Sequence, residues 1–382
     1  MRPSLRLASA AIAAALIGSL TAVPATARVV DPAPLQAPTF NKMVHSIVHS
    51  GSTVYVGGNF GTVTDANGTY ARHGVAAYNA DTGLVLPWNP DVHGLVYAVA
   101  VRNQSVFLGG AFDAVGGQPR SNLARVSATT GQALKGLRKA NGAVRAIAAT
   151  KKQVLVGGDF TKLGSARRVH LAGFTSSGKY RLNGWHPRAT GGTVYTIQPT
   201  KGGAYVGGTY KKLNGKKAFG RISRINPVTG KLVKGFNPPV TVPVYDIAAT
   251  PRRVYVAMGG PGGGSSGSFV TKTGKRKWLR SVNGDAQTIS VLSGSVYVGG
   301  HFTRACLSSG TLSSGECTGS SVMRGKIMAI TLKGTIRSFA PQIDSQFGLV
   351  AMDVFPSRGW LAVGGTFNFV DNDARGKFAV FG

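Results

Sequence analysis

Acidic side chains, on which much hydrolytic and metal-dependent chemistry depends, are scarce in this chain. It carries 13 Asp and Glu residues against 44 Lys and Arg, and Glu316 is the one glutamate. A glycosidase needs two placed carboxylates, and no motif marks such a pair here. The chain also lacks a His-Glu-x-x-His motif and a phosphate-binding loop. The sequence therefore favours a binding or scaffold protein over an enzyme, and it predicts neither a metal site nor a cofactor.

An enzyme remains the alternative, with a few candidate residues. The residue after each repeated glycine pair varies along the chain, as the residues of a site would. Equivalent strand ends can ring a pocket at the centre of a circular fold. On this alternative the protein is a polysaccharide-active enzyme with its site at that central opening, although an ordinary strand-end role is the simpler interpretation. The candidate pocket residues are Asn59, Asp159, Thr209 and His301.

Basic residues are concentrated in one part of the chain. Residues 135–280 contain 28 Lys and Arg and two acids, a net charge of +26 out of +31 for the whole chain. We call this stretch the basic sector, because sequence order becomes angular position in a ring of repeats. Its candidate binding residues fall in predicted turns and loops on both rims: Lys151, Lys152, Lys162, Arg167, Lys211, Lys212, Lys216, Lys217, Arg252 and Arg253.

Such a charged sector attracts polyanions. Outside a cell these include anionic wall polymers, acidic polysaccharides, phospholipid headgroups and DNA, and a protein partner is also compatible. Nucleic acid is the least favoured, because no regular row of exposed aromatics accompanies the cations and no known binding motif occurs. Solubility without a specific partner is the competing interpretation. No run after the N-terminal leader is long enough for a membrane helix, and we expect a monomer.

A seven-residue motif recurs along the chain. Its first copy, Val54 to Phe60, reads Val-Tyr-Val-Gly-Gly-Asn-Phe. A period of about 50 residues, made of short apolar runs and Gly-rich turns, is typical of a β-propeller. The sequence predicts an all-β, seven-bladed β-propeller of four-stranded blades. The further copies are 106–112, 154–160, 204–210, 296–302 and 361–367, with a degenerate copy at 254–260.

Two repeated features are expected to be structural. The glycine pair permits a positive φ or a close backbone approach, and the aromatic residue after it is expected to pack between blades. An arginine also recurs just before the third strand of five units, and we expect it to stack on that aromatic ring. These arginines are Arg72, Arg120, Arg168, Arg324 and Arg375.

The two ends of the chain have distinct roles. Residues 1–27 resemble a secretory signal peptide, with Arg2 and Arg6 before an apolar run and a small-residue cleavage site. The rest, 28–382, is expected to be a single secreted, extracellular propeller domain. The last unit lacks an outer strand, and we expect residues 28–42 to supply it and close the ring.

Two units depart from the common pattern. The fifth contains a Gly-, Ser- and Pro-rich run at 259–267, for which we expect a mobile loop or a short third strand. The sixth carries an insertion at 303–321 that contains Cys306 and Cys317. In an exported protein these cysteines predict a disulfide, worth about 3 kcal/mol by loop entropy.

The repeat resembles a known type. The order Val-Tyr-Val-Gly-Gly-x-Phe, then Arg, then an apolar strand ending in Thr-Gly, then Trp-Asn-Pro is similar to the delta-60 type repeat of bacterial β-propellers of unknown function. It also resembles the repeats of fungal bud-site proteins and, at wider spacing, kelch repeats. The composition resembles that of secreted actinobacterial proteins. The resemblance implies a propeller in an extracellular or envelope setting, and it supplies no catalytic residues.

Overall fold

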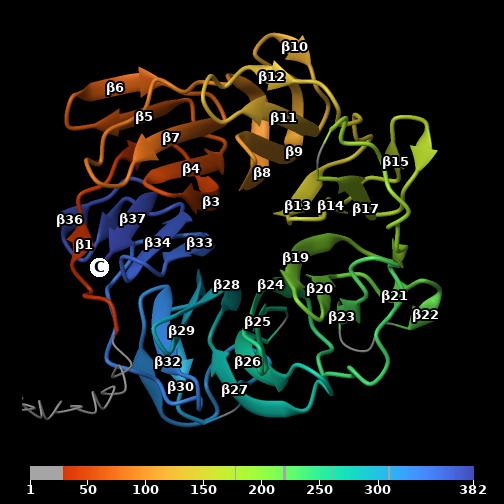
Figure 1. Ribbon diagram of the computed structural model, residues 1–382. Coiled ribbons are helices and arrows are strands. Elements are labelled where there is room, and N and C mark those ends of the chain that lie inside the picture. Colours follow the sequence, from red (N-terminus) through yellow and green to blue (C-terminus); the bar gives the residue numbers. More distant parts are fainter. Residues whose placement is uncertain (1–28, 177, 218–220, 261, 309) are drawn as a thin grey trace, which may run out of the picture.

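The named elements of the described chain are all β-strands, joined by turns, and the described residues include no α-helix. The computed structural model describes residues 29–176, 178–217, 221–260, 262–308 and 310–382. The expected leader at 1–27 lies outside these residues. Figure 1 shows the sheets following one another in chain order around a common centre. The innermost strands contact one another in the order β3, β8, β13, β19, β24, β28 and β33, and β33 contacts β3.

The sheets are built on one antiparallel pattern. An inner strand forms a hairpin with the strand that carries the glycine pair, and a third strand pairs on the outer side of that strand. In chain order these triplets are β3 (Val44–Ser50), β4 (Thr53–Gly58) and β7 (Val75–Asn79); β8 (Val92–Arg102), β9 (Ser105–Val115) and β11 (Leu123–Ser127); β13 (Val144–Ala149), β14 (Gln153–Gly158) and β17 (Leu171–Thr175); β19 (Val194–Thr200), β20 (Gly203–Gly208) and β23 (Ile222–Ile225); β24 (Val244–Ala249), β25 (Arg253–Met258) and β26 (Gly264–Val270); β28 (Asp285–Leu292), β29 (Ser295–His301) and β32 (Ile327–Thr331); and β33 (Leu349–Phe355), β34 (Trp360–Gly365) and β37 (Phe378–Phe381).

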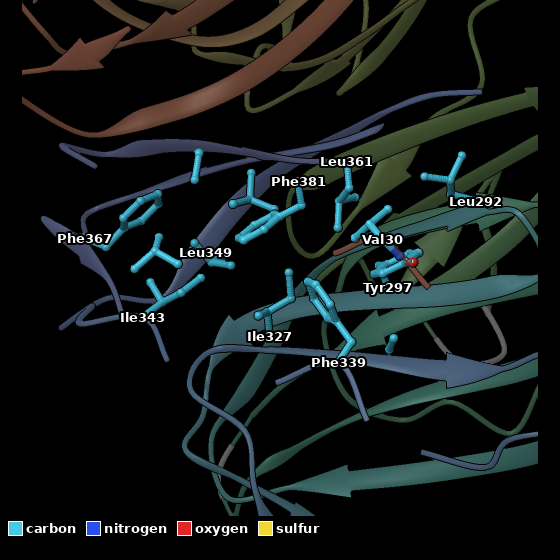
Figure 2. Packing of buried hydrophobic residues seen from close by; sticks show 14 residues of the cluster. Val30, Leu292, Tyr297, Ile327, Phe339, Ile343, Leu349, Leu361, Phe367 and Phe381 are labelled. Atoms are coloured by element: carbon cyan, nitrogen blue, oxygen red, sulfur yellow. Dashed lines mark hydrogen bonds between the residues drawn. The ribbon is translucent and has the colours of Figure 1, made fainter. Parts of the chain in front are cut away.

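The hydrophobic core lies between neighbouring sheets. The Val-Tyr-Val run of β4 is buried on both faces, because a sheet flanked on each side needs apolar residues on both. Figure 2 shows one such layer, where Phe339 lies between Tyr297 and Phe381. Both ring pairs have centroids 5.5 Å apart in edge-on contact. Each layer is therefore shared by two sheets.

The glycine pair allows close approach in two directions. A Cβ on Gly207 would lie 2.5 Å from Val244 Cγ1 on the next inner strand, and a Cβ on Gly208 would lie 2.0 Å from the Thr193 oxygen of its own sheet. Opposite this pair the register shifts between Val194 and Thr196, which is a β-bulge. Neither glycine has a positive φ. Of the two roles considered, the pair serves close approach.

The fourth strand expected in each blade is short. In the second sheet it is β12 (Ala133–Leu134), which pairs with β11. In several sheets the outer edge is a single bridge, as between Tyr78 and Val85. Two of the recurrent arginines hold this edge through hydrogen bonds to carbonyl groups, a contact that the sequence did not predict. Arg72 donates to the Leu86 oxygen at 2.9 Å, and Arg324 donates to the Arg337 oxygen at 2.8 Å.

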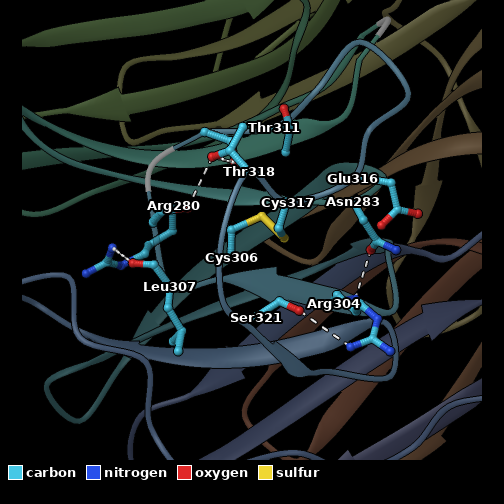
Figure 3. Close-up of a disulfide and its surroundings, with 12 residues drawn as sticks. Arg280, Asn283, Arg304, Cys306, Leu307, Thr311, Glu316, Cys317, Thr318 and Ser321 are labelled. Carbon is cyan, nitrogen blue, oxygen red and sulfur yellow. Dashed lines mark hydrogen bonds between the residues drawn. A yellow bond between two sulfur atoms is a disulfide. The ribbon is translucent and has the colours of Figure 1, made fainter.

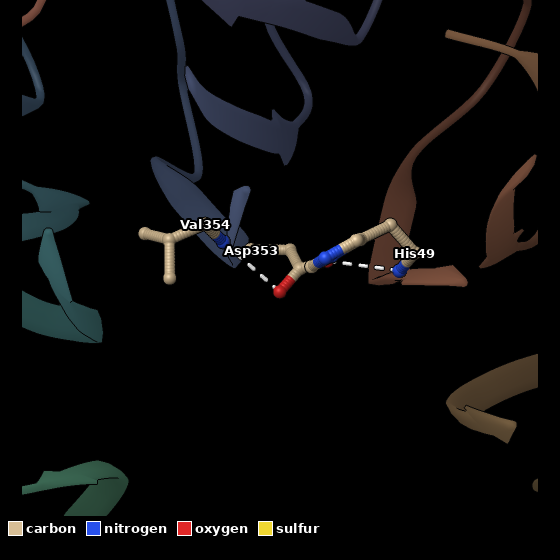
Figure 4. Close-up of polar contacts among 3 residues, drawn as sticks. All are labelled: His49, Asp353 and Val354. Atoms are coloured by element: carbon tan, nitrogen blue, oxygen red, sulfur yellow. Dashed lines mark hydrogen bonds and ion pairs between the residues drawn. The ribbon is translucent and has the colours of Figure 1, made fainter. Parts of the chain in front are cut away.

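The two ends of the described chain meet in one sheet. Strand β1 (Pro34–Leu35) pairs antiparallel with β37, with Pro34 opposite Phe381. Beside this sheet, His49 of β3 contacts Asp353 of β33 (Figure 4), with Nδ1 2.7 Å from Oδ2. The His49 ring also stacks on Phe355 at 4.2 Å. The hydrogen bond to Asp353 raises the pKa of His49.

The fifth and sixth units are built differently from the others. In the glycine-rich run, residues 259–260 and 262–263 lie outside any strand, whereas 264–267 belong to β26, which has seven residues where a short third strand was expected and pairs with β25 and with β27 (Arg276–Val282). Its buried Ser266 and Ser268 fit where larger side chains would not. Strand β27 continues the sheet into the insertion through β30 (Arg304–Cys306) and β31 (Ser321–Met323). The predicted disulfide between Cys306 and Cys317 is present, with Cα atoms 5.4 Å apart (Figure 3).

Candidate functional site

A polar cavity of about 210 Å³ lies where the inner strands converge. Each inner strand has a β-bulge, near the start of its pairing in six strands and in the middle of β8, and the residue at that bulge lines the cavity. Bulges re-aim side chains, so residues that would otherwise follow the strand alternation face the centre. We call these residues the bulge ring: His45, Tyr97, Arg145, Tyr195, Tyr245, Gln287 and Val350.

Arg145 is held rigidly in this ring. Its Nε donates to Asp159 Oδ2 at 2.8 Å, and Thr193 Oγ1 donates to Asp159 Oδ1 at 2.6 Å. The guanidinium carbon lies 4.6 Å from the centroid of the Tyr97 ring and 5.7 Å from that of Tyr195. An ion pair on one edge and aromatic faces beside it fix the orientation of the guanidinium.

The other polar members of the bulge ring are uncharged at neutral pH. His45 packs edge-on against Tyr97 at 5.4 Å, and burial, helped by the nearby Arg145 charge, lowers the pKa of His45 to about 4. Burial raises the pKa of Tyr245 to about 12. Gln287 has a buried Oε1 without a hydrogen-bond partner among the described residues. The bulge ring thus combines one cation with neutral donors and acceptors.

Two carboxylates approach the cavity, and both are occupied by protein partners. Asp159 is paired with Arg145. Asp246 accepts hydrogen bonds from the Ile289 amide and Thr288 Oγ1, each at 3.0 Å, while burial raises the pKa of its carboxyl. These contacts tie β24 to β28 and leave neither group placed as a free acid or base. Among the described residues, no three His, Cys, Asp or Glu side chains gather as metal ligands would.

The four sequence-derived pocket candidates do not form one site. Asp159 reaches the cavity only through Arg145, and Thr209 supports the wall, because its Oγ1 accepts from the Thr193 amide at 2.9 Å. Asn59 is exposed and lines a separate open cleft beside His73. His301 is exposed at the end of β29. The structure therefore does not bring these four side chains together at one pocket.

Sequence reasoning missed the bulge ring, although a signal existed. His45 and Arg145 both stand twelve residues before the first glycine of their pair, at Gly57 and Gly157, and directly after a buried valine. The residue type at this position changes from one repeat to the next. The bulge that points it inward is visible only in the pairing register.

The basic sector presents its candidate residues on hairpins and tight turns. Two equivalent hairpins carry cations on facing strands: Lys162 is opposite Arg167 in β15 (Lys162–Leu163) and β16 (Ala166–Arg167), and Lys212 is opposite Lys217 in β21 (Lys212–Leu213) and β22 (Lys216–Lys217). Directly opposed like charges destabilise a hairpin. The remaining candidates precede the latter hairpin or lie at strand-joining turns: Lys211, Lys151, Lys152, Arg252 and Arg253.

Almost none of the charge in the basic sector is neutralised by protein carboxylates. Of its described cations, only Arg145 forms an ion pair. The candidates on the β21–β22 hairpin are exposed to solvent. This surface therefore projects a strong positive field that the protein itself does not cancel.

Comparisons with known proteins establish the fold. No protein-family model and no curated protein matches the chain. The WD40 β-propeller domain of Doa1 is similar in structure, with a TM-score of 0.58 and 12% identity over 91% of this chain and 96% of that chain. The Dos1 propeller gives 0.55 and 10% over 91% and 95%, and the computationally designed Ika8 protein gives 0.53 and 14% over 91% and 98%. At such identities the likeness shows the fold alone, an all-β propeller. No helix in the described residues is long and apolar enough to cross a membrane.

Proposed function

We propose that this protein is a secreted, non-enzymatic binding module that holds an anionic extracellular or cell-envelope polymer through the basic sector. The observation that carries the proposal is the uncompensated charge of that sector, in which one described cation alone has a carboxylate partner. A polyanion that displaces counterions from such a surface gains affinity without any deep pocket. The ligand class is an acidic polysaccharide or anionic wall polymer.

The two like-charged hairpins are the best-defined part of the binding surface. Lys212 and Lys217 repel each other in the free protein, as do Lys162 and Arg167. A bound chain of anionic groups would offset both repulsions at once. The equivalent hairpin of β5 (Thr62–Asp65) and β6 (Gly68–Ala71) pairs Thr62 with Ala71 at the corresponding position, so it adds no like-charged pair to the surface.

The proposal includes a closed ring of seven blades built on the delta-60 type repeat. The cyclic contacts of the inner strands support it. A Cβ on Gly364 would lie 2.4 Å from Val44 Cγ1, so the last sheet approaches the first as closely as consecutive sheets approach each other. The short β1 strand on the last sheet supports closure by residues 28–42. The disulfide and the leader-like N-terminus support secretion.

Salt-gradient retention on immobilised anionic and neutral polysaccharide, wall polymer and DNA tests the proposal. The Lys212→Glu/Lys217→Glu double variant should elute from the preferred polymer at lower salt, with a shallower dependence of affinity on salt. The matched control is Lys42→Glu/Lys333→Glu, which makes the same change in net charge at exposed positions outside the sector. An equal loss of retention in both variants, or equal retention of the native protein on every polyanion, would show that the basic sector attracts polyanions only non-specifically.

A further inference from the structure

We propose that the central cavity is a second binding site, for a small hydroxycarboxylate, with Arg145 receiving the carboxylate. This site is separate from the polymer-binding surface and does not depend on it. The cavity volume of about 210 Å³ is below the range of about 300–1,000 Å³ of drug-sized ligand sites. Its occupant is therefore a molecule of roughly one sugar ring or smaller, and a folded polymer segment is excluded.

The side chains that line the cavity favour a ligand with one negative charge. Arg145 is its one cationic side chain at neutral pH, because His45 is neutral there. Asp159 accepts from Nε, so the two terminal amino groups are the donors left for a ligand. A guanidinium presents such donors as a planar fork that matches a carboxylate. Since Asp159 and the Tyr97 ring already fix the guanidinium, little ordering cost remains on binding.

The remaining walls point to hydroxyl groups on the same ligand. Gln287 lines the same cavity, and a side-chain amide both donates to and accepts from hydroxyl groups. Tyr195 and Tyr245 lie 5.6 Å apart along the same wall, and they offer ring faces together with polar hydroxyl tips.

A neutral sugar and a bare acid each satisfy only half of this arrangement. A neutral sugar would leave the Arg145 terminal donors without an anion. A simple carboxylate without hydroxyls would make no use of the Gln287 amide or of the tyrosine hydroxyls. The combination of one fixed guanidinium with neutral polar side chains selects a carboxylate that also bears hydroxyl groups.

The test compares D-glucuronate with D-glucose, which differ at the carboxylate, and lactate with acetate, which differ by a hydroxylated carbon. Binding to the whole protein is measured by ligand-observed NMR and calorimetry in about 0.15 M salt, where long-range attraction is screened. We expect saturable binding of glucuronate or lactate at millimolar concentration and at least tenfold weaker binding of the partner lacking the carboxylate or the hydroxyl. Absence of saturable binding by both hydroxycarboxylates overturns the proposal.

Variants locate the binding. Arg145→Lys keeps the charge and loses the fork, and it should weaken binding by about tenfold or more. Gln287→Glu keeps the shape and places a second carboxylate in the cavity, and it should abolish binding. Arg252→Gln removes an exposed cation of the basic sector and should leave binding unchanged. If Arg252→Gln weakens binding as much as Arg145→Lys does, the ligand is held by the surface field and the cavity assignment is wrong. Near-ultraviolet circular dichroism confirms that each variant is folded.

Discussion

Replacing Gly208 with alanine should destabilise the protein far more than replacing Gly207, although both changes add one methyl group at a buried position. The Gly207 methyl would meet Val244 Cγ1 at 2.5 Å and Thr196 Cγ2 at 2.9 Å, and such side-chain overpacking costs about 1–3 kcal/mol. The Gly208 methyl would meet the Thr193 carbonyl oxygen at 2.0 Å. That carbonyl accepts the Thr209 amide at 2.9 Å. Moving it breaks a bulge hydrogen bond as well, so the expected cost is about 3 kcal/mol or more.

Urea unfolding followed by tryptophan fluorescence measures these costs. The control is Gly184→Ala, because a Cβ there has no neighbour within 4 Å and Gly184 has no positive φ. That change should be neutral or stabilise by up to about 1 kcal/mol through the unfolded chain. A Gly208→Ala variant within 1 kcal/mol of the Gly184→Ala variant would show that the bulge backbone yields freely, and it would refute the explanation given for the glycine pair.

Two further changes test the seam and the outer edge. The raised pKa of His49 means that its pairing with Asp353 contributes stability below pH 6.5 and loses it as pH rises through the raised value. Asp353→Asn should therefore cost more in mildly acidic than in alkaline buffer, and an equal cost in both would show that the pair carries no charge. Arg324 bridges the Met323 and Arg337 carbonyls at 2.6 and 2.8 Å. A lysine cannot span both carbonyls, so Arg324→Lys should lower the free energy of unfolding in urea by about 1–2 kcal/mol. The control, Arg304→Lys at an exposed site, should lower it little. Equal losses in the two variants would contradict the edge-holding role.

The propeller fold could be predicted from the sequence because each unit buries the same kind of apolar strands and therefore repeats the same residue pattern. The first five residues of the motif copy at Val54 to Phe60 coincide with β4 at Thr53–Gly58. The outer strands were less predictable, because they have a sheet neighbour on one side only and rely on arginine side chains. The run at 259–267 was only partly predictable, because its Gly and Ser composition favours a loop, which fits 259–260 and 262–263, whereas Ser266 is buried within β26.

The candidate site was only partly predictable. The basic sector followed from counting charges, because neighbours in sequence become neighbours around the ring. The bulge ring did not, because strand alternation alone does not reveal a one-residue bulge. Asp159 was identified for its position, but its role as the partner of Arg145 depends on contacts between residues on different strands.

The bulges also bear on how the cavity can change. Each inner strand contributes one member of the bulge ring, and Val350 shows that an apolar residue is accepted where Arg145 stands in another repeat. The glycine pairs and the apolar layers that maintain the scaffold are separate positions. Substitution of the one bulge-ring residue in each repeat would therefore change which ligands fit the cavity, while the fold stays the same. A combinatorial library confined to these positions would turn the molecule into a selectable platform for new small-molecule receptors.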